Sequence, residues 1–162
     1  MNPLPAYRYG AARTMVYLHE QYMQEFLKVW QKAKAAEIAL PPTDDPSYVS
    51  LEMLLRHVLR AARYYMVWMC ENLALPNPEI KPVPELDVIE GGAESYLAHL
   101  THQWRLPLAE VEEEQFNRPE YPSSWGVKYC VDAMLEHAVM HPILHRVQLE
   151  ELLEEQAPDE QK

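Results

Sequence analysis

Three histidines spaced four residues apart, His137, His141 and His145, are the side chains whose type and spacing best fit metal chemistry. They lie in residues 124–156, SWGVKYCVDAMLEHAVMHPILHRVQLEELLEEQ, whose hydrophobic periodicity is typical of one long helix. At 100° per residue the three fall on one face of that helix. Residues four apart on a helix have Cβ atoms roughly 5–6 Å apart, so two such imidazoles can bind one metal ion. The glutamate of the HExxH protease motif is absent, so protease chemistry is not predicted.

The same periodicity places these histidines on the face of the helix that we expect to be buried. That face also carries Cys130, Met134, Gln148 and Leu152, whereas the opposite face carries Lys128, Asp132, Glu136, Arg146, Glu150 and Glu154. Two interpretations are open: core histidines that bond to their neighbours, or ligands of a metal ion. A neutral imidazole buried without partners costs about 1–3 kcal/mol. Because one ion would remove that cost for two rings at once, three histidines in a row favour the metal.

Four helical segments must position these side chains. Periodicity predicts helices over residues 6–37, 50–74, 92–112 and 124–156, with Ser47 or Ser50 capping the second and Ser123 or Ser124 the fourth. The chain has 162 residues with four glycines, and its fourteen prolines cluster between these segments. The connection over residues 75–92 exceeds the roughly two to eight residues usual between bundle helices, which favours a long crossover. We therefore predict one all-α domain over residues 1–162, a four-helix bundle whose tail frays from about residue 157.

The other four histidines fall at different places on these helices. His57 lies at the edge of the buried face of the second helix, beside the small Ala61, and is the candidate third ligand. His19 is expected to be half-exposed, with a role as an extra ligand or as a partner of a ligand as the alternative. His99 and His102 are expected on the solvent side of the third helix, although their i, i+3 spacing is also compatible with a metal. The buried stripes behind these placements are Ala11, Met15, Leu18, Tyr22, Phe26 and Val29 in the first helix, Leu54, Val58, Ala61, Tyr65 and Trp68 in the second, and Ala93, Leu97, Leu100, Trp104 and Leu108 in the third.

Composition argues against several classes of function. A formal net charge of -11 disfavours nucleic acid and anionic membrane as partners, because both need a basic surface. The two cysteines, Cys70 and Cys130, form no CxxC motif, so neither a disulfide scaffold nor a cysteine zinc site is indicated. The N-terminal residues lack the apolar core of a signal peptide, and no apolar run is long enough to span a bilayer. We expect a cytoplasmic protein.

His57 and the segment HAVMHPILHRVQ, residues 137–148, resemble the pattern of the DinB superfamily, which includes YfiT-like proteins. The resemblance extends over nearly the whole chain in helix order. It implies an up-down-down-up four-helix bundle with a divalent metal ion held by His57, His141 and His145. Two positions depart from the family pattern. Val147 replaces a glycine, and Pro142 directly follows a proposed ligand, where a kink would re-aim His141.

The resemblance also implies a class of activity. Some members of the superfamily are thiol-dependent transferases or isomerases that use bacillithiol, mycothiol or glutathione, so we expect a small thiol and an electrophilic small molecule as partners. Three imidazoles suit zinc, nickel, iron, manganese or copper, and they leave a coordination position open, as in catalytic sites. A hydrolase is the second enzymatic option.

Cys130 is too far from His141 to be a ligand, and Asp132 and Glu136 project away from the site.

Two further predictions concern residues of the fourth helix near the proposed ligands. His137, one turn before His141, either bonds to a ligand histidine, carries a proton, or packs in the core. The alternative to an enzyme is a non-catalytic, metal-stabilised bundle that acts through protein partners. Val139 and Ile143 are expected on the exposed side of the fourth helix, where they would serve a partner surface or a homodimer.

Overall fold

The computed structural model describes residues 3–157, and helices make up most of this part of the chain. The four long helices are α1 (Gly10–Ala35), α2 (Leu51–Asn72), α3 (Ile89–Trp104) and α5 (Val131–Glu155). The short elements are the 3-10 helix η1 (Pro46–Tyr48), helix α4 (Glu113–Asn117) and the two-residue strands β1 (Tyr121–Pro122) and β2 (Lys128–Tyr129). The all-α prediction is confirmed. Most of the tail that was expected to fray lies outside the described residues.

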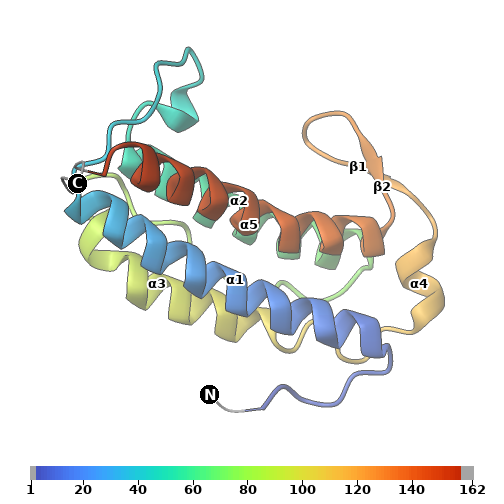
Figure 1. The fold of residues 1–162 in the computed structure, drawn as a ribbon. Coiled ribbons are helices and arrows are strands. Elements are labelled where there is room, and N and C mark those ends of the chain that lie inside the picture. Colours follow the sequence, from blue (N-terminus) through green and yellow to red (C-terminus); the bar gives the residue numbers. More distant parts are fainter. Residues whose placement is uncertain (1–2, 158–162) are drawn as a thin grey trace.

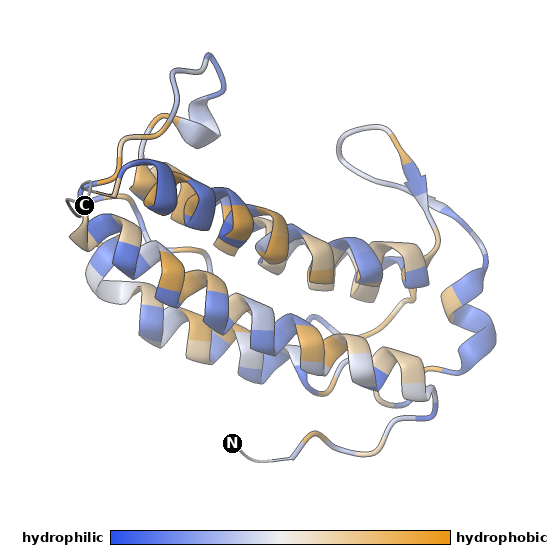
Figure 2. Ribbon diagram, in the orientation of Figure 1, coloured by the Kyte–Doolittle hydropathy of each residue, from blue (hydrophilic) through white to orange (hydrophobic). Residues whose placement is uncertain are grey.

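The long helices lie side by side, and α1 and α5 run in one direction while α2 and α3 run in the other (Figure 1). The most extensive contact between elements joins α1 to α5, and α5 also packs on α2. Helix α3 packs on both α1 and α2. Each long helix carries both hydrophobic and hydrophilic residues around its axis (Figure 2), as expected of helices that bury one side. None of the helices in the described part of the chain is long and apolar enough to cross a bilayer.

Both ends of α2 are close to the predicted residues 50 and 74, whereas the start of α1 and the end of α3 differ for local reasons. Helix α1 begins at Gly10 rather than at residue 6, because the preceding segment bonds elsewhere: the backbone N–H of Arg8 donates to the carbonyl of Ala109 at 3.0 Å. Helix α3 ends at Trp104 instead of reaching residue 112, since Pro107 cannot continue it. Helix α2 begins after Ser50, whose hydroxyl accepts from the N–H of Met53 at 3.2 Å, as predicted.

The start of α5 was predicted wrongly. The helix begins at Val131 with Cys130 as its N-cap, and neither Ser123 nor Ser124 caps it. Residues 121–129 instead form a hairpin in which Tyr121 pairs with Tyr129. Its turn contains Gly126 with φ of +86°, a left-handed conformation that a helix cannot include. The helix then continues without interruption through Pro142.

The buried face of α1 is rotated by about one residue from the predicted stripe. Ala11 is exposed, and the buried residues include Ala12, Val16, His19, Glu20, Met23, Phe26 and Trp30. This rotation buries His19, which was predicted at the edge of the stripe, and Glu20, which was predicted on the opposite, polar face. Arg105 compensates for Glu20: its Nη2 and Nε donate to the carboxylate at 2.6 and 3.0 Å.

The outer face of α5 also differs from the prediction. Val139 is buried, not exposed, and Ile143 is half-buried. The apolar side chains that α5 exposes are Met140, Leu144 and Val147. The cause is the rotation set by packing on both α1 and α2, which buries a wider arc than one stripe.

The Glu20–Arg105 pair generates a prediction about stability. Both side chains are largely buried, with exposures of 6% and 16%, so removing the carboxylate leaves a charge in a poorly solvated place. We expect Glu20→Ala to lower the free energy of unfolding by about 3 kcal/mol in urea denaturation. Glu110→Ala removes one of the two exposed carboxylates that pair with Arg8 and is the control, with no measurable loss expected. Equal effects of the two changes would contradict this interpretation.

Candidate metal centre

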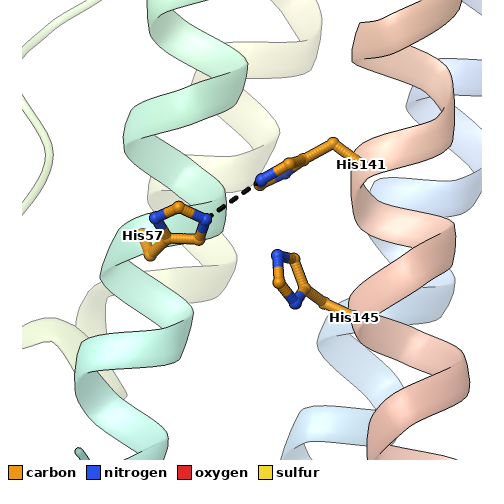
Figure 3. A group of neighbouring side chains, drawn as sticks. All are labelled: His57, His141 and His145. Carbon is orange, nitrogen blue, oxygen red and sulfur yellow. Dashed lines mark hydrogen bonds between the residues drawn. The ribbon is translucent and has the colours of Figure 1, made fainter. Parts of the chain in front are cut away.

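His57 on α2 and His141 and His145 on α5 point into the same space between the two helices (Figure 3). One ring nitrogen of each residue lies within 4.8 Å of the other two. The Nε2 atoms of His57 and His141 are only 3.0 Å apart. The structure therefore brings together the three residues that the sequence analysis selected.

Local structure explains this convergence. His141 and His145 are one turn apart on α5, so their side chains stack along the same face, and their ring centroids are 4.7 Å apart. The contact between α2 and α5 brings His57 opposite this pair, with centroid distances of 4.9 Å to His141 and 5.3 Å to His145. A long-range contact thus adds the third ring to a locally determined pair.

His145 has one satisfied and one unsatisfied ring nitrogen. Its Nδ1 lies 2.9 Å from Oε1 of Gln148, and because a carbonyl oxygen only accepts, Nδ1 carries the hydrogen. Nε2 then presents a lone pair, and this buried atom has no hydrogen-bond partner within residues 3–157. A buried acceptor without a partner costs about 1–3 kcal/mol, which a metal ion bound at this atom would remove.

Burial keeps all three imidazoles neutral, which is the form that binds metals. Desolvation lowers the pKa of His141 to about 2, with smaller contributions from the neighbouring histidines. Burial also lowers the pKa of His145 to about 4, although the bond to Gln148 opposes this shift. The pKa of His57 is lowered as well, mainly by burial.

These residues fit a divalent transition metal. Tetrahedral coordination with metal–nitrogen distances of roughly 2.0–2.1 Å separates neighbouring ligand nitrogens by about 3.3–3.4 Å. The observed separations, from 3.0 Å to no more than 4.8 Å, bracket that value. A set of three neutral nitrogens suits zinc, nickel, copper or iron better than calcium or magnesium, which prefer oxygen.

A pocket of about 530 Å³ adjoins two of the three histidines and opens to solvent. His57 and His141 form part of its wall, so the proposed metal centre is reachable from outside. Much of the remaining wall is aromatic and comes from Tyr48, Tyr64, Tyr65 and Trp125. This arrangement differs from a closed structural metal site, in which protein ligands fill the coordination sphere.

His137 lies in the same pocket but outside the group of three. It is half-buried, and its ring stacks on Trp125 with centroids 5.6 Å apart and an interplanar angle of 28°. Its centroid is 6.4 Å from that of His141, and burial lowers its pKa. His137 is therefore a neutral, partly accessible imidazole next to the ligand candidates, and not a packed core residue.

Among the pocket residues that the sequence analysis missed, Tyr48 and Trp125 come from outside the four long helices. The hydroxyl of Tyr48 lies 3.5 Å from Nε2 of His57, and its ring contacts that of His145 at a centroid distance of 5.5 Å. Tyr48 belongs to η1, within a stretch that the sequence indicated only as a loop. Trp125 was assigned to a helix, whereas it occupies the hairpin between β1 and β2. The only signal for each was an aromatic side chain close in the sequence to a candidate histidine.

None of His19, His99 and His102 belongs to this group of three, and the exposure of two of them differs from the prediction. His19 is almost fully buried, not half-exposed, and stacks on Trp104 with centroids 3.7 Å apart. His102 is exposed as expected, whereas His99 is half-buried and accepts a bond from the N–H of Lys81 at 3.1 Å. Within residues 3–157, the three histidines of the proposed centre are the only group of three or more His, Cys, Asp or Glu residues arranged to hold a metal ion.

Comparisons with known proteins add no assignment: no family model, curated protein or solved structure matches this chain. The function therefore has to be inferred from the site itself.

The burial of His19 predicts a pH dependence of stability. Burial lowers its pKa to about 3, so below about pH 6.5 the unfolded chain binds a proton that the folded chain does not. The protein should therefore lose stability from this residue as the pH falls from 6.5 towards 3. We expect His19→Phe to reduce the loss of unfolding free energy between pH 6.5 and pH 5 by about 2 kcal/mol, measured by urea denaturation at each pH. His102→Gln, an exposed control, should leave the dependence unchanged, and curves for His19→Phe parallel to the wild type would refute the assignment.

Proposed function

We propose that this chain binds a divalent metal ion through His57, His141 and His145 and is a metal-dependent enzyme that transfers a small thiol to an electrophilic molecule. The observation that carries the proposal is the convergence of three neutral imidazole nitrogens beside an open pocket. When bound, a metal ion of this kind would supply Lewis acidity, which lowers the pKa of a coordinated thiol or water.

The pocket residues suggest how the reaction would proceed. The thiol loses its proton, its sulfur forms a bond to the electrophilic carbon, and the leaving group departs with its bonding electrons. His137 is neutral and reaches the pocket, so it is suited to accept the proton. The hydroxyl of Tyr48, whose pKa is raised mainly by burial, stays protonated and is suited to donate a hydrogen bond to a bound reactant. Trp125 and Tyr64 would cover the reactants and exclude water.

The arrangement of the helices supports a DinB-like four-helix bundle as part of this proposal. Helices α1 and α5 run opposite to α2 and α3 (Figure 1), which is the up-down-down-up order expected for that superfamily. Residues 73–88 connect the parallel helices α2 and α3, as a long crossover requires. The helix order and the three converging histidines both agree with the DinB pattern, and these two agreements support this part of the proposal.

A non-catalytic role is the second candidate. Met140, Leu144 and Val147 form an exposed apolar stripe on α5 with i, i+4, i+7 spacing, which suits a protein partner or a second copy of the chain. A metal ion would then stabilise the helices and the pocket would have no substrate. Hydrolysis is a third candidate, in which water would occupy the coordination position that the three histidines leave open. No carboxylate lines the pocket, so a hydrolase would also have to use His137 as its base.

The first test removes one proposed ligand. His141→Ala should lose most bound metal, measured by elemental analysis after dialysis against zinc, and should retain its helical circular dichroism. It should also lose any transfer of glutathione or bacillithiol to 1-chloro-2,4-dinitrobenzene that the metal-loaded wild type catalyses. A purely structural metal would instead make the variant unfold, because metal binding would be part of the folding free energy. His102→Ala is the control, and full retention of metal by His141→Ala would eliminate this site.

The second test addresses the orientation of His145. Gln148 holds Nδ1 and directs Nε2 towards the other two rings, and partners of this kind contribute about 10–100-fold to metal affinity. We expect Gln148→Ala to weaken zinc binding by about that factor in competition with a chelator. Because Gln148 is exposed, the melting temperature of the metal-free protein should change little. An unchanged zinc affinity would show that this bond does not orient a ligand.

A further inference from the structure

The pocket beside the three histidines has a charge opposite to that of the protein. The chain carries 25 Asp and Glu residues against 14 Lys and Arg, yet none of the residues that line this pocket is acidic. The only fully charged side chains in its wall are Arg56 and Arg60. A negatively charged ligand would therefore meet attraction in this pocket and repulsion over much of the remaining surface.

The two arginines are one turn apart on α2 and flank His57. Arg60 is exposed and makes no ion pair or hydrogen bond within the described part of the chain, so its guanidinium group is available to a ligand. Nη2 of Arg56 pairs with Glu85 at 2.8 Å, but its buried Nε has no hydrogen-bond partner among residues 3–157. The charge of Arg60 also contributes, after burial, to the lowered pKa of His57. The arginines thus lie close to the proposed metal centre.

Another part of the pocket wall is aromatic. Trp125 is 44% exposed and contacts the rings of Tyr64 and Tyr65 at centroid distances of 5.6 and 6.5 Å. The backbone N–H of Ser124 donates to the hydroxyl of Tyr64 at 2.8 Å, which fixes the hairpin against α2. Because its other face is supported by His137, Trp125 offers a preformed surface for a planar group.

We propose that the pocket binds a small aromatic carboxylate, with its ring against Trp125 and its carboxylate against the exposed guanidinium group of Arg60. This inference deepens the proposed function, on which it rests for one point: the aromatic carboxylate is the electrophilic substrate and not the thiol. A carboxylate matches the planar guanidinium group of Arg60 in geometry as well as in charge. A neutral or cationic aromatic molecule would gain the stacking but not the ion pair, so charge would determine selectivity in this pocket.

The test compares two probes of similar size and shape, one negatively charged and one neutral. Phenylacetate and the neutral phenylacetamide are titrated into the full chain, both metal-free and zinc-loaded, and followed by NMR chemical shifts. We expect metal-free protein to bind phenylacetate at least about 5-fold more tightly than phenylacetamide, the factor that about 1 kcal/mol from one exposed ion pair provides. Equal affinity for the two probes would overturn the proposal.

Two variants locate the binding. Arg60→Gln should weaken phenylacetate binding by about 5-fold and leave phenylacetamide unaffected, whereas Trp125→Ala should weaken both probes. Lys28→Gln is the matched control, because it removes one exposed positive charge on α1 that does not line this pocket. Equal effects of Arg60→Gln and Lys28→Gln would refute the role of Arg60. Circular dichroism melts of each variant show whether the fold is retained.

The titration of metal-free protein with phenylacetate tests this proposal independently of the proposed function. Arg60-dependent binding of phenylacetate by metal-free protein would support the pocket assignment even if the protein bound no metal or transferred no thiol. Binding that requires zinc and ignores Arg60 would mean that the carboxylate is a metal ligand, which would overturn the proposal. Competition by phenylacetate against an aromatic electrophile, but not against the thiol, would support its role as the electrophilic substrate; competition against the thiol alone would overturn that role.

Discussion

The site depends on the desolvation of three imidazole rings that face one another between α2 and α5. A neutral imidazole brings one donor and one acceptor, so rings packed together cannot satisfy all their nitrogens among themselves. His57 and His141 share one bond between their Nε2 atoms, while Nε2 of His145 lacks a partner. Protonation would add a donor but is opposed by burial, as the lowered pKa of His141 indicates. A metal ion would accept a lone pair from each of the three rings at one point.

This arrangement requires a fixed rotation of α5, and α1 provides much of the support. The contact between α1 and α5 is the most extensive in the described structure. Arg146, which follows His145 in the sequence, forms an ion pair with Glu25 of α1 at 2.5 Å. The buried pair between Glu20 and Arg105 then ties α1 to the segment after α3. The contact with α1 and the ion pair to Glu25 therefore help to set which face of α5 turns towards His57, while the buried pair holds α1 against the segment after α3.

Segments outside the four long helices complete the pocket. Helix η1 contributes Tyr48, and the hairpin contributes Ser124 and Trp125, whereas α2 and α5 contribute the charged side chains and the histidines. This division is common in proteins whose rigid elements hold the reactive groups and whose loops determine what reaches them. It also explains the mixed character of the pocket, because the arginines of α2 meet Trp125 of the hairpin and Tyr48 of η1 only after folding.

Local periodicity was enough to place the helices, the edge position of His57 and the shared face of His141 and His145, because each depends on residues within a few turns of one another. It failed where distant contacts override local preference. The sequence placed His19 at the edge of the buried stripe of α1, whereas packing against Trp104 buries it. Glu20 is buried as well, and its charge is paired with Arg105, which is distant in the sequence. It extended α5 back to residue 124, whereas the pairing of Tyr121 with Tyr129 forms a hairpin there. The sequence alone therefore determined which side chains could bind a metal, and only the tertiary structure decided how close they come and what surrounds them, because those distances depend on helix rotation and loop docking.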